Sequence, residues 1–124
     1  LFITHDLGIV SELADKVVTM YAGKTVETAP VRAFFQNAQH PYSVGLVNAI
    51  PRLTLDDRPI ISIPGTPPDM VSEECGCAFA PRCSRCVPVC QEKVPKNSAV
   101  DRMEDWYCAC WNPTSRGEQI GKDN

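Results

Sequence analysis

The sequence predicts an α+β fold that ends in an irregular, cysteine-rich lobe. Regular apolar patterns are confined to residues 1–50, whereas eight of the eleven prolines lie between Pro51 and Pro95. All seven cysteines lie between Cys75 and Cys110. At 124 residues and 44% hydrophobic content the chain is long and apolar enough for one folded unit, which excludes wholesale disorder.

The patterns of the first thirty residues predict a strand, a helix and a hairpin. Leu1-Phe2-Ile3 is expected to form a short buried strand, and Asp6 to cap the helix that follows. The apolar positions of that helix are Leu7, Val10, Ala14 and Val17. The β-branched residues of 17–21 predict a strand, Ala22-Gly23 a turn, and the alternation over 24–28 a second, half-exposed strand.

Two short helices and an extended connector are expected next. Pro30 fits the first position of one helix, which carries Val31, Phe34 and Phe35. His40-Pro41 opens the second helix and Pro51 stops it. Its expected inward residues are Tyr42, Leu46, Ala49 and Ile50. The proline-rich stretch 63–68 predicts an extended connector that packs on a surface.

Charge and hydropathy exclude two classes of function. A net charge of −3 argues against nucleic acid as the main partner, because phosphate neutralisation needs clustered Lys and Arg. No apolar run approaches the ~20 residues that cross a bilayer. The sequence begins at Leu1 in what reads as the middle of a strand, so we expect a piece of a longer protein.

His5 follows the first expected strand and precedes the first expected helix. A neutral imidazole at such an edge can donate one hydrogen bond to a phosphate oxygen and accept another from water. On the residues alone, a helix cap or a satisfied polar group is the commoner role for such a histidine.

Longer motifs place His5 in a recognisable context. Leu1-Phe2-Ile3-Thr4-His5-Asp6-Leu7-Gly8 and Met20-Tyr21-Ala22-Gly23-Lys24 resemble the end of an ABC-transporter ATPase domain. Further motifs resemble the ATPase subunits of oligopeptide/dipeptide importers: Gln39-His40-Pro41-Tyr42, Ile50-Pro51-Arg52-Leu53, Ile63-Pro64-Gly65-Thr66-Pro67-Pro68 and Gly76-Cys77-Ala78-Phe79-Ala80-Pro81-Arg82-Cys83.

The resemblance implies a role for His5 and a set of partners. His5 would be the switch histidine that contacts the γ-phosphate in the intact subunit, which binds ATP and Mg²⁺. The chain has no G-x-x-x-x-G-K-[ST] loop, so we expect it to be inactive alone. The implied partners are a second ATPase subunit, two permease subunits and, indirectly, a substrate-binding protein, at the cytoplasmic face of the inner membrane. The substrate is a peptide, or nickel.

The seven cysteines predict a metal site rather than disulfides, because their number is odd and nothing suggests secretion. Subunits of the resembled type that carry four matching cysteines are implied to bind a [4Fe–4S] cluster. The matching residues are Cys77, Cys83, Cys90 and Cys110. Arg82 is expected to offset their negative charge, and Trp106 and Trp111 to cover the site.

These implications divide the chain into four parts and leave alternatives open. We expect the end of the ATPase domain at 1–50, a connector at 51–75, the cluster-binding domain at 76–112 and a flexible tail at 113–124. Zinc held with Cys86 and Cys108 is an alternative, as are plain thiols or disulfides. A free-standing metal-bound redox or protein-interaction module is the alternative function. We also expect the isolated chain to dimerise through its first strand.

Overall fold

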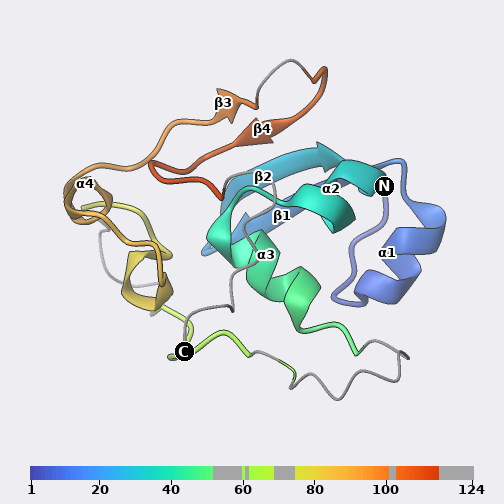
Figure 1. The fold of residues 1–124 in the computed structure, drawn as a ribbon, viewed down its shortest axis with the longest axis horizontal. Coiled ribbons are helices and arrows are strands. Elements are labelled where there is room, and N and C mark those ends of the chain that lie inside the picture. The colour runs from blue at the N-terminus through green and yellow to red at the C-terminus, as the bar shows by residue number, and fades with distance from the viewer. Residues whose placement is uncertain (52–59, 61, 69–74, 101–102, 115–124) are drawn as a thin grey trace.

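The computed structural model describes residues 1–51, 60, 62–68, 75–100 and 103–114, and it confirms an α+β fold. The longer helices and strands are α1 (Leu7–Leu13), β1 (Lys16–Tyr21), β2 (Lys24–Pro30), α2 (Val31–Asn37) and α3 (Pro41–Asn48). The shorter elements are the 3₁₀ turn η1 (Ala80–Arg82), α4 (Pro88–Glu92), β3 (Ser98–Ala99) and β4 (Tyr107–Cys108). Figure 1 shows their arrangement.

The predicted hairpin is confirmed, and it contains an irregularity. β1 and β2 are antiparallel and joined by Ala22 and Gly23, whose φ angles of 48° and 75° suit a two-residue turn. The register shifts between Thr19 and Met20, which pair with Glu27 and Thr25, so Val26 is an extra residue in β2. Because of this bulge, Val26 and Glu27 are both buried although they are neighbours in sequence.

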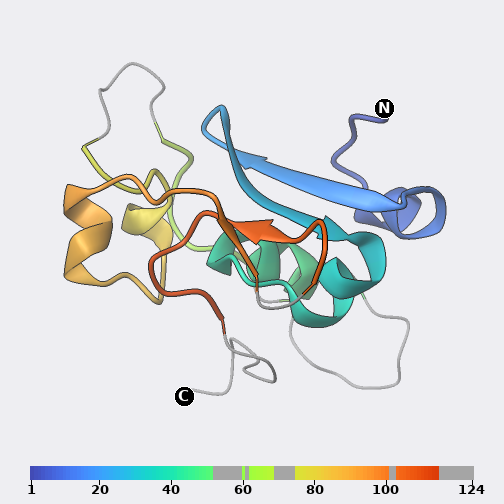
Figure 2. The ribbon, with the colours of Figure 1, turned by 90° about the horizontal axis from the view of Figure 1, so that it is seen from above.

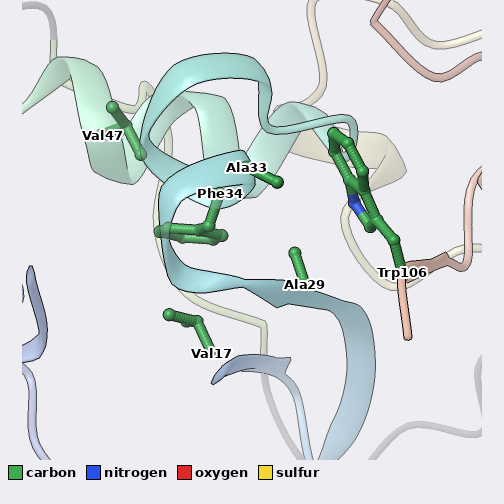
Figure 3. Packing of buried hydrophobic residues seen from close by; sticks show 6 residues of the cluster. All are labelled: Val17, Ala29, Ala33, Phe34, Val47 and Trp106. Atoms are coloured by element: carbon green, nitrogen blue, oxygen red, sulfur yellow. The ribbon is translucent and has the colours of Figure 1, made fainter. Parts of the chain in front are cut away.

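Helices α2 and α3 cover one face of the sheet and enclose the main core. Phe34 is the centre of this core, with 1% of its surface exposed, and the core also contains a residue from far along the chain, Trp106. Figure 3 shows Phe34 and Ala33 of α2 between Val47 of α3 and the hairpin residues Ala29 and Val17. The buried members are Val17, Ala29, Ala33, Phe34, Val47 and Trp106.

The first residues do not form the expected strand. Leu1, Phe2 and Ile3 are irregular and exposed, because the described residues include no strand that pairs with them. Asp6 caps α1 as predicted, with its carboxylate accepting from the amides of Gly8 and Ile9 at 2.9 and 3.3 Å. α1 ends at Leu13, so Val17 belongs to β1 and not to the helix.

The helix starts are close to the prediction, but the buried face of α3 is not. Pro30 immediately precedes α2 rather than occupying its first position, and His40 is the N-cap of α3. The buried residues of α3 are Pro41, Ser43, Val44 and Val47. The four residues expected to point inward (Tyr42, Leu46, Ala49 and Ile50) are only partly buried, because α3 packs through Val47 against the core.

The C-terminal half returns to the sheet of the hairpin. The sheet order is β1-β2-β4-β3, with Cys108 of β4 opposite Glu27 of β2. Figure 2 shows α4 and α1 at opposite ends of the molecule, with the sheet between them. The cysteine-rich segment therefore leaves the sheet region and comes back to it through β3 and β4.

The described part of the connector packs on the protein as predicted. Ile63 lies in contact distance of Gly45 on α3 and packs with Tyr21 and Phe79. Residues 62–68 contain no helix or strand. The rest of the expected connector, at 52–59, 61 and 69–74, lies outside the described residues, as does 115–124 of the expected tail. Among the described residues, none of the helices has the length and apolar character needed to cross a membrane.

Candidate functional site

His5 lies on the surface, directly before α1. Its side chain is exposed in a bend, and Asp6 beside it caps the helix. The helix that follows His5 is at the opposite end of the molecule from α4 (Figures 1 and 2). His5 therefore has no direct role in the cysteine-rich region of this chain, and the two features are separate candidate sites.

The four cysteines of the resembled motif are neighbours in the fold. The pKa of Cys110 is raised to about 11, mainly by burial and also by the nearby Cys83, Cys77 and Cys90. Burial likewise raises the pKa of Cys77 and of Cys83, and electrostatic repulsion from Cys90 also raises the pKa of each. Three separate segments supply the set: the loop around η1, helix α4, and the chain after β4.

Backbone amides lie near three of these four sulfur atoms. The amides of Phe79 and Ala80 lie near the sulfur of Cys77 and the amide of Arg85 lies near that of Cys83, and each favours the thiolate form. The Ala80 amide itself donates to the carbonyl oxygen of Cys77 at 3.0 Å. The amide of Asn112 donates to Sγ of Cys110 at 3.4 Å. Each amide near a sulfur stabilises the thiolate form and opposes the effect of burial. Burial outweighs these contacts, because the pKa of each of the three thiols stays above its usual value.

The fourth cysteine, Cys90, is fixed through its backbone. The amide of Cys77 donates to the carbonyl oxygen of Cys90 at 2.7 Å, which ties the first thiol loop to α4. Gly76 permits this approach, since a Cβ at that position would lie 2.7 Å from the carbonyl carbon of Gln91. No larger residue fits there without a movement of the main chain.

The cysteines of the zinc alternative are placed differently. Burial, and then the carboxylate of Glu27, raise the pKa of Cys108 far above its usual range, so Cys108 stays a protonated thiol. Cys86 lies beside Cys90 and donates to the carbonyl of Val87 at 3.8 Å, while Cys75 is exposed. Within the described ranges, no three His, Cys, Asp or Glu side chains, the four motif cysteines included, are arranged to hold a single metal ion.

A buried carboxylate, that of Glu27, lies next to this region, and the sequence pattern does not predict its burial. The alternation over 24–28 predicts Glu27 on the solvent side, but the bulge at Val26 turns it inward, and none of its surface is exposed. Its two oxygens accept from the amides of Gln39 and His40 and from Nε1 of Trp106, each at 2.9 Å. Glu27 thus joins β2, the loop before α3 and the residue preceding β4.

His40 is a structural residue, as its place at a helix start predicts. Nδ1 accepts from the amide of Tyr42 at 3.1 Å, and burial lowers the pKa of the ring to about 4. His40 is therefore neutral near pH 7, and the tautomer that leaves Nδ1 free to accept carries its proton on Nε2.

Three residues expected to surround the thiols have other contacts. Arg82 donates to the carbonyl of Pro64 at 2.9 Å and to the hydroxyl of Tyr21 at 3.3 Å, so it ties the connector to the hairpin. Trp106 belongs to the main core instead of covering the cysteines. Trp111 is partly exposed and donates to the carbonyl of Lys93, which follows α4.

Comparison with known proteins places these features in a family. The model of the family described as "Oligopeptide/dipeptide transporter, C-terminal region" matches residues 26–90. A putative peptide import ATP-binding protein of Brucella melitensis is 42% identical over 117 residues, which are 90% of this chain and 35% of that protein. The dipeptide transport ATP-binding protein DppD of Bacillus subtilis is 41% identical over 118 residues, which are 95% of this chain and 35% of DppD.

A third relative gives the same assignment over a shorter stretch. The oligopeptide transport ATP-binding protein OppD of Salmonella typhimurium is 44% identical over 95 residues, covering 77% of this chain and 28% of OppD. The chain thus spans about a third of the length of the curated relatives that it matches. The family match covers more than half of the sequence, from within β2 through α2 and α3 to Cys90, the third of the four motif cysteines. The chain therefore belongs to the oligopeptide/dipeptide transporter C-terminal region family.

Proposed function

We propose that this chain is the C-terminal region of the ATP-binding subunit of an importer for oligopeptides or dipeptides. The observation that carries the proposal is the similarity over 90% of the chain to a protein named as a peptide import ATP-binding protein. Nickel is the alternative cargo. The substrate is selected elsewhere in such a system, by the binding protein and the permeases.

In the intact subunit His5 would contact the γ-phosphate of ATP bound with Mg²⁺. Its exposed position before α1 leaves the imidazole accessible to a nucleotide held by other parts of the protein. The subunit would act with a second ATPase subunit and two permeases at the cytoplasmic face of the membrane. The isolated chain is expected to release no phosphate from ATP, since phosphoryl transfer needs a phosphate-binding loop that this sequence lacks.

A chimera tests the importer role. The chain replaces the matching 118 residues of Bacillus subtilis DppD, and dipeptide uptake is measured in a strain that lacks DppD. We expect uptake to be restored, and a His5→Ala chimera of equal abundance to lose most of it. A chimera that assembles with the permeases but supports no uptake would contradict the proposal. Uptake that is unchanged by His5→Ala would remove only the role of His5.

We further propose that Cys77, Cys83, Cys90 and Cys110 hold a [4Fe–4S] cluster. The support is chemical: four neighbouring thiols, three of which have backbone amides near the sulfur, and a fourth tied to the first by a backbone bond. Four thiolates suffice for such a cluster, which supplies a covalent link among segments that carry little regular structure. Its proposed role is structural.

Metal analysis of the anaerobically purified chain tests this second proposal. About four irons and four sulfides per chain, with broad visible absorbance, are expected. Zinc at about one per chain without colour would favour the alternative in which Cys86 and Cys108 take part, although Cys108 is held as a thiol beside Glu27. A low-potential couple that passes electrons to a partner protein would favour a redox module over a structural cluster.

A further inference from the structure

Two of the proposed ligand loops are built alike. In the first, Cys83 is followed two residues later by Arg85, whose amide lies near the sulfur of Cys83 and favours its thiolate form. In the second, Cys110 is followed two residues later by Asn112, whose amide donates to Sγ of Cys110 at 3.4 Å. In each loop the amide of the second residue after the cysteine thus lies near the sulfur, although the two loops are 27 residues apart in sequence.

The residues that supply these two amides also bond to each other. Arg85 donates from Nε to the carbonyl oxygen of Asn112 at 3.3 Å and from Nη2 to Oδ1 of Asn112 at 3.3 Å. Asn112 returns a bond from Nδ2 to the carbonyl oxygen of Arg85 at 3.1 Å. Nη2 of Arg85 also donates to the carbonyl oxygen of Pro113 at 3.4 Å. Each side chain therefore fixes the main chain of the other loop.

Arg82, the arginine nearest in sequence, has different partners. Arg82, three residues earlier, bonds to Pro64 and Tyr21 and so serves the connector and the hairpin. A lysine does not replace Arg85, because only the planar guanidinium offers several donors in one fork. Both Arg85 and Asn112 are half-buried, which keeps water from replacing all of these bonds.

We propose that Arg85 and Asn112 are a pair of positioning residues that hold the Cys83 and Cys110 loops in register, so that both sulfurs face one shared cluster. Neither residue is a ligand. The pair acts by fixing the two amides that lie near the sulfurs and by preventing the loops from separating. The inference rests on the proposed cluster for its consequence, but the pairing itself is a property of the chain without metal.

The first measurement needs no metal. Amide hydrogen exchange of the reduced, metal-free chain is followed by NMR in wild type, Arg85→Ala, Arg85→Lys and Arg82→Ala. In both Arg85 variants the Asn112 amide is expected to exchange about tenfold faster, while the Gln39 amide, bonded to Glu27, is unchanged. Arg82→Ala should leave Asn112 protected. Equal protection of Asn112 in wild type and Arg85→Ala would overturn the proposal.

The second measurement follows the cluster. Iron extraction by an excess of chelator is timed for the same variants, for Asn112→Ala and for the double variant Arg85→Ala/Asn112→Ala. Loss of either residue should speed extraction by about tenfold, as for other groups that orient metal ligands. The double variant should be no faster than the faster single variant, whereas multiplied effects would show that the residues act independently. Extraction from Arg82→Ala should match wild type.

The two measurements separate failure of the pair from failure of the cluster. A wild-type chain that holds no iron after anaerobic reconstitution with iron and sulfide refutes the cluster, and the exchange experiment then decides the pairing alone. A chain that holds four irons but loses them at the same rate in all variants refutes the positioning role.

Discussion

Replacement of Glu27 by glutamine tests whether one buried carboxylate joins the two halves of the chain. Glu27 is fully buried, and three donors converge on it at 2.9 Å: the amides of Gln39 and His40, and Nε1 of Trp106. Oε1 accepts two of these bonds and Oε2 accepts one. An amide of nearly the same shape has only one accepting oxygen, so at least one donor must face an NH₂ group.

The loss of stability expected for Glu27→Gln follows from these contacts. In the better orientation of the substituted side chain, its amide oxygen faces Gln39 and Trp106 and its NH₂ group faces the amide of His40. One buried donor then loses its partner, at about 1–3 kcal/mol, and the two remaining bonds lose their charge assistance. We expect Glu27→Gln to lower the free energy of unfolding by about 3 kcal/mol, a large fraction for a chain of this size.

Urea unfolding near pH 7.5, followed by circular dichroism, measures this loss. Trp106→Phe removes a single donor, and the double variant completes a cycle that isolates the bond between the two side chains. The expected coupling is about 1 kcal/mol, the difference between a charged and a neutral acceptor for the indole. A Glu27→Gln variant within about 0.5 kcal/mol of wild type, or an additive cycle, would refute the role given to Glu27.

Three further predictions concern other parts of the fold. Burial lowers the pKa of His40 from 6.5 to about 4, so the unfolded chain takes up a proton before the folded chain as pH falls. The free energy of unfolding should therefore drop by about 2 kcal/mol between about pH 7.5 and about pH 5. His40→Asn keeps a cap acceptor, and its urea unfolding should lack this pH-dependent loss. Gly76→Ala should cost about 2 kcal/mol in the same assay because the new Cβ meets backbone of α4, whereas Gly45→Ala meets only the side chain of Ile63 and should cost less than half as much. Asp6→Ala should raise the protease sensitivity of α1 through loss of about 1 kcal/mol of capping energy, and Asp6→Asn should not; equal digestion of both variants would contradict the capping role.

The parts of the fold that sequence predicts well are those that local chemistry decides. Asp6 caps a helix, Ala22-Gly23 forms the hairpin turn, and His40-Pro41 begins α3, because each depends on a few adjacent residues. Leu1-Phe2-Ile3 has the composition of a buried strand, yet a strand also needs a partner, and none pairs with it among the described residues. Propensity alone therefore predicts the wrong state there.

In the candidate site, too, the sequence predicts some features, whereas others depend on residues far apart in the chain. The spacing of the motif cysteines, read through the family resemblance, selects four residues near enough to influence one another electrostatically, and their role as ligands stays a prediction. The pattern gives no sign that Glu27 faces inward, because a one-residue bulge reverses the alternation of β2. It also cannot show that Arg82 and Arg85, three residues apart, serve the hairpin and the thiol loops respectively, since both choices depend on distant carbonyl groups.

Alternate residues of the segment 106–112 connect these features. Trp106 donates to Glu27, Cys108 lies opposite Glu27 in the sheet, Cys110 is a proposed ligand, and Asn112 pairs with Arg85. The amide of Ala109 donates to the carbonyl of Val26, so pairing with β2 extends one residue beyond β4 and ends directly before Cys110. The position of this thiol is thus fixed on one side by the sheet and on the other by Asn112. The last part of the cysteine-rich segment, from β4 to Cys110, thus continues the hairpin's sheet, and the position of Cys110 depends on the first half of the chain.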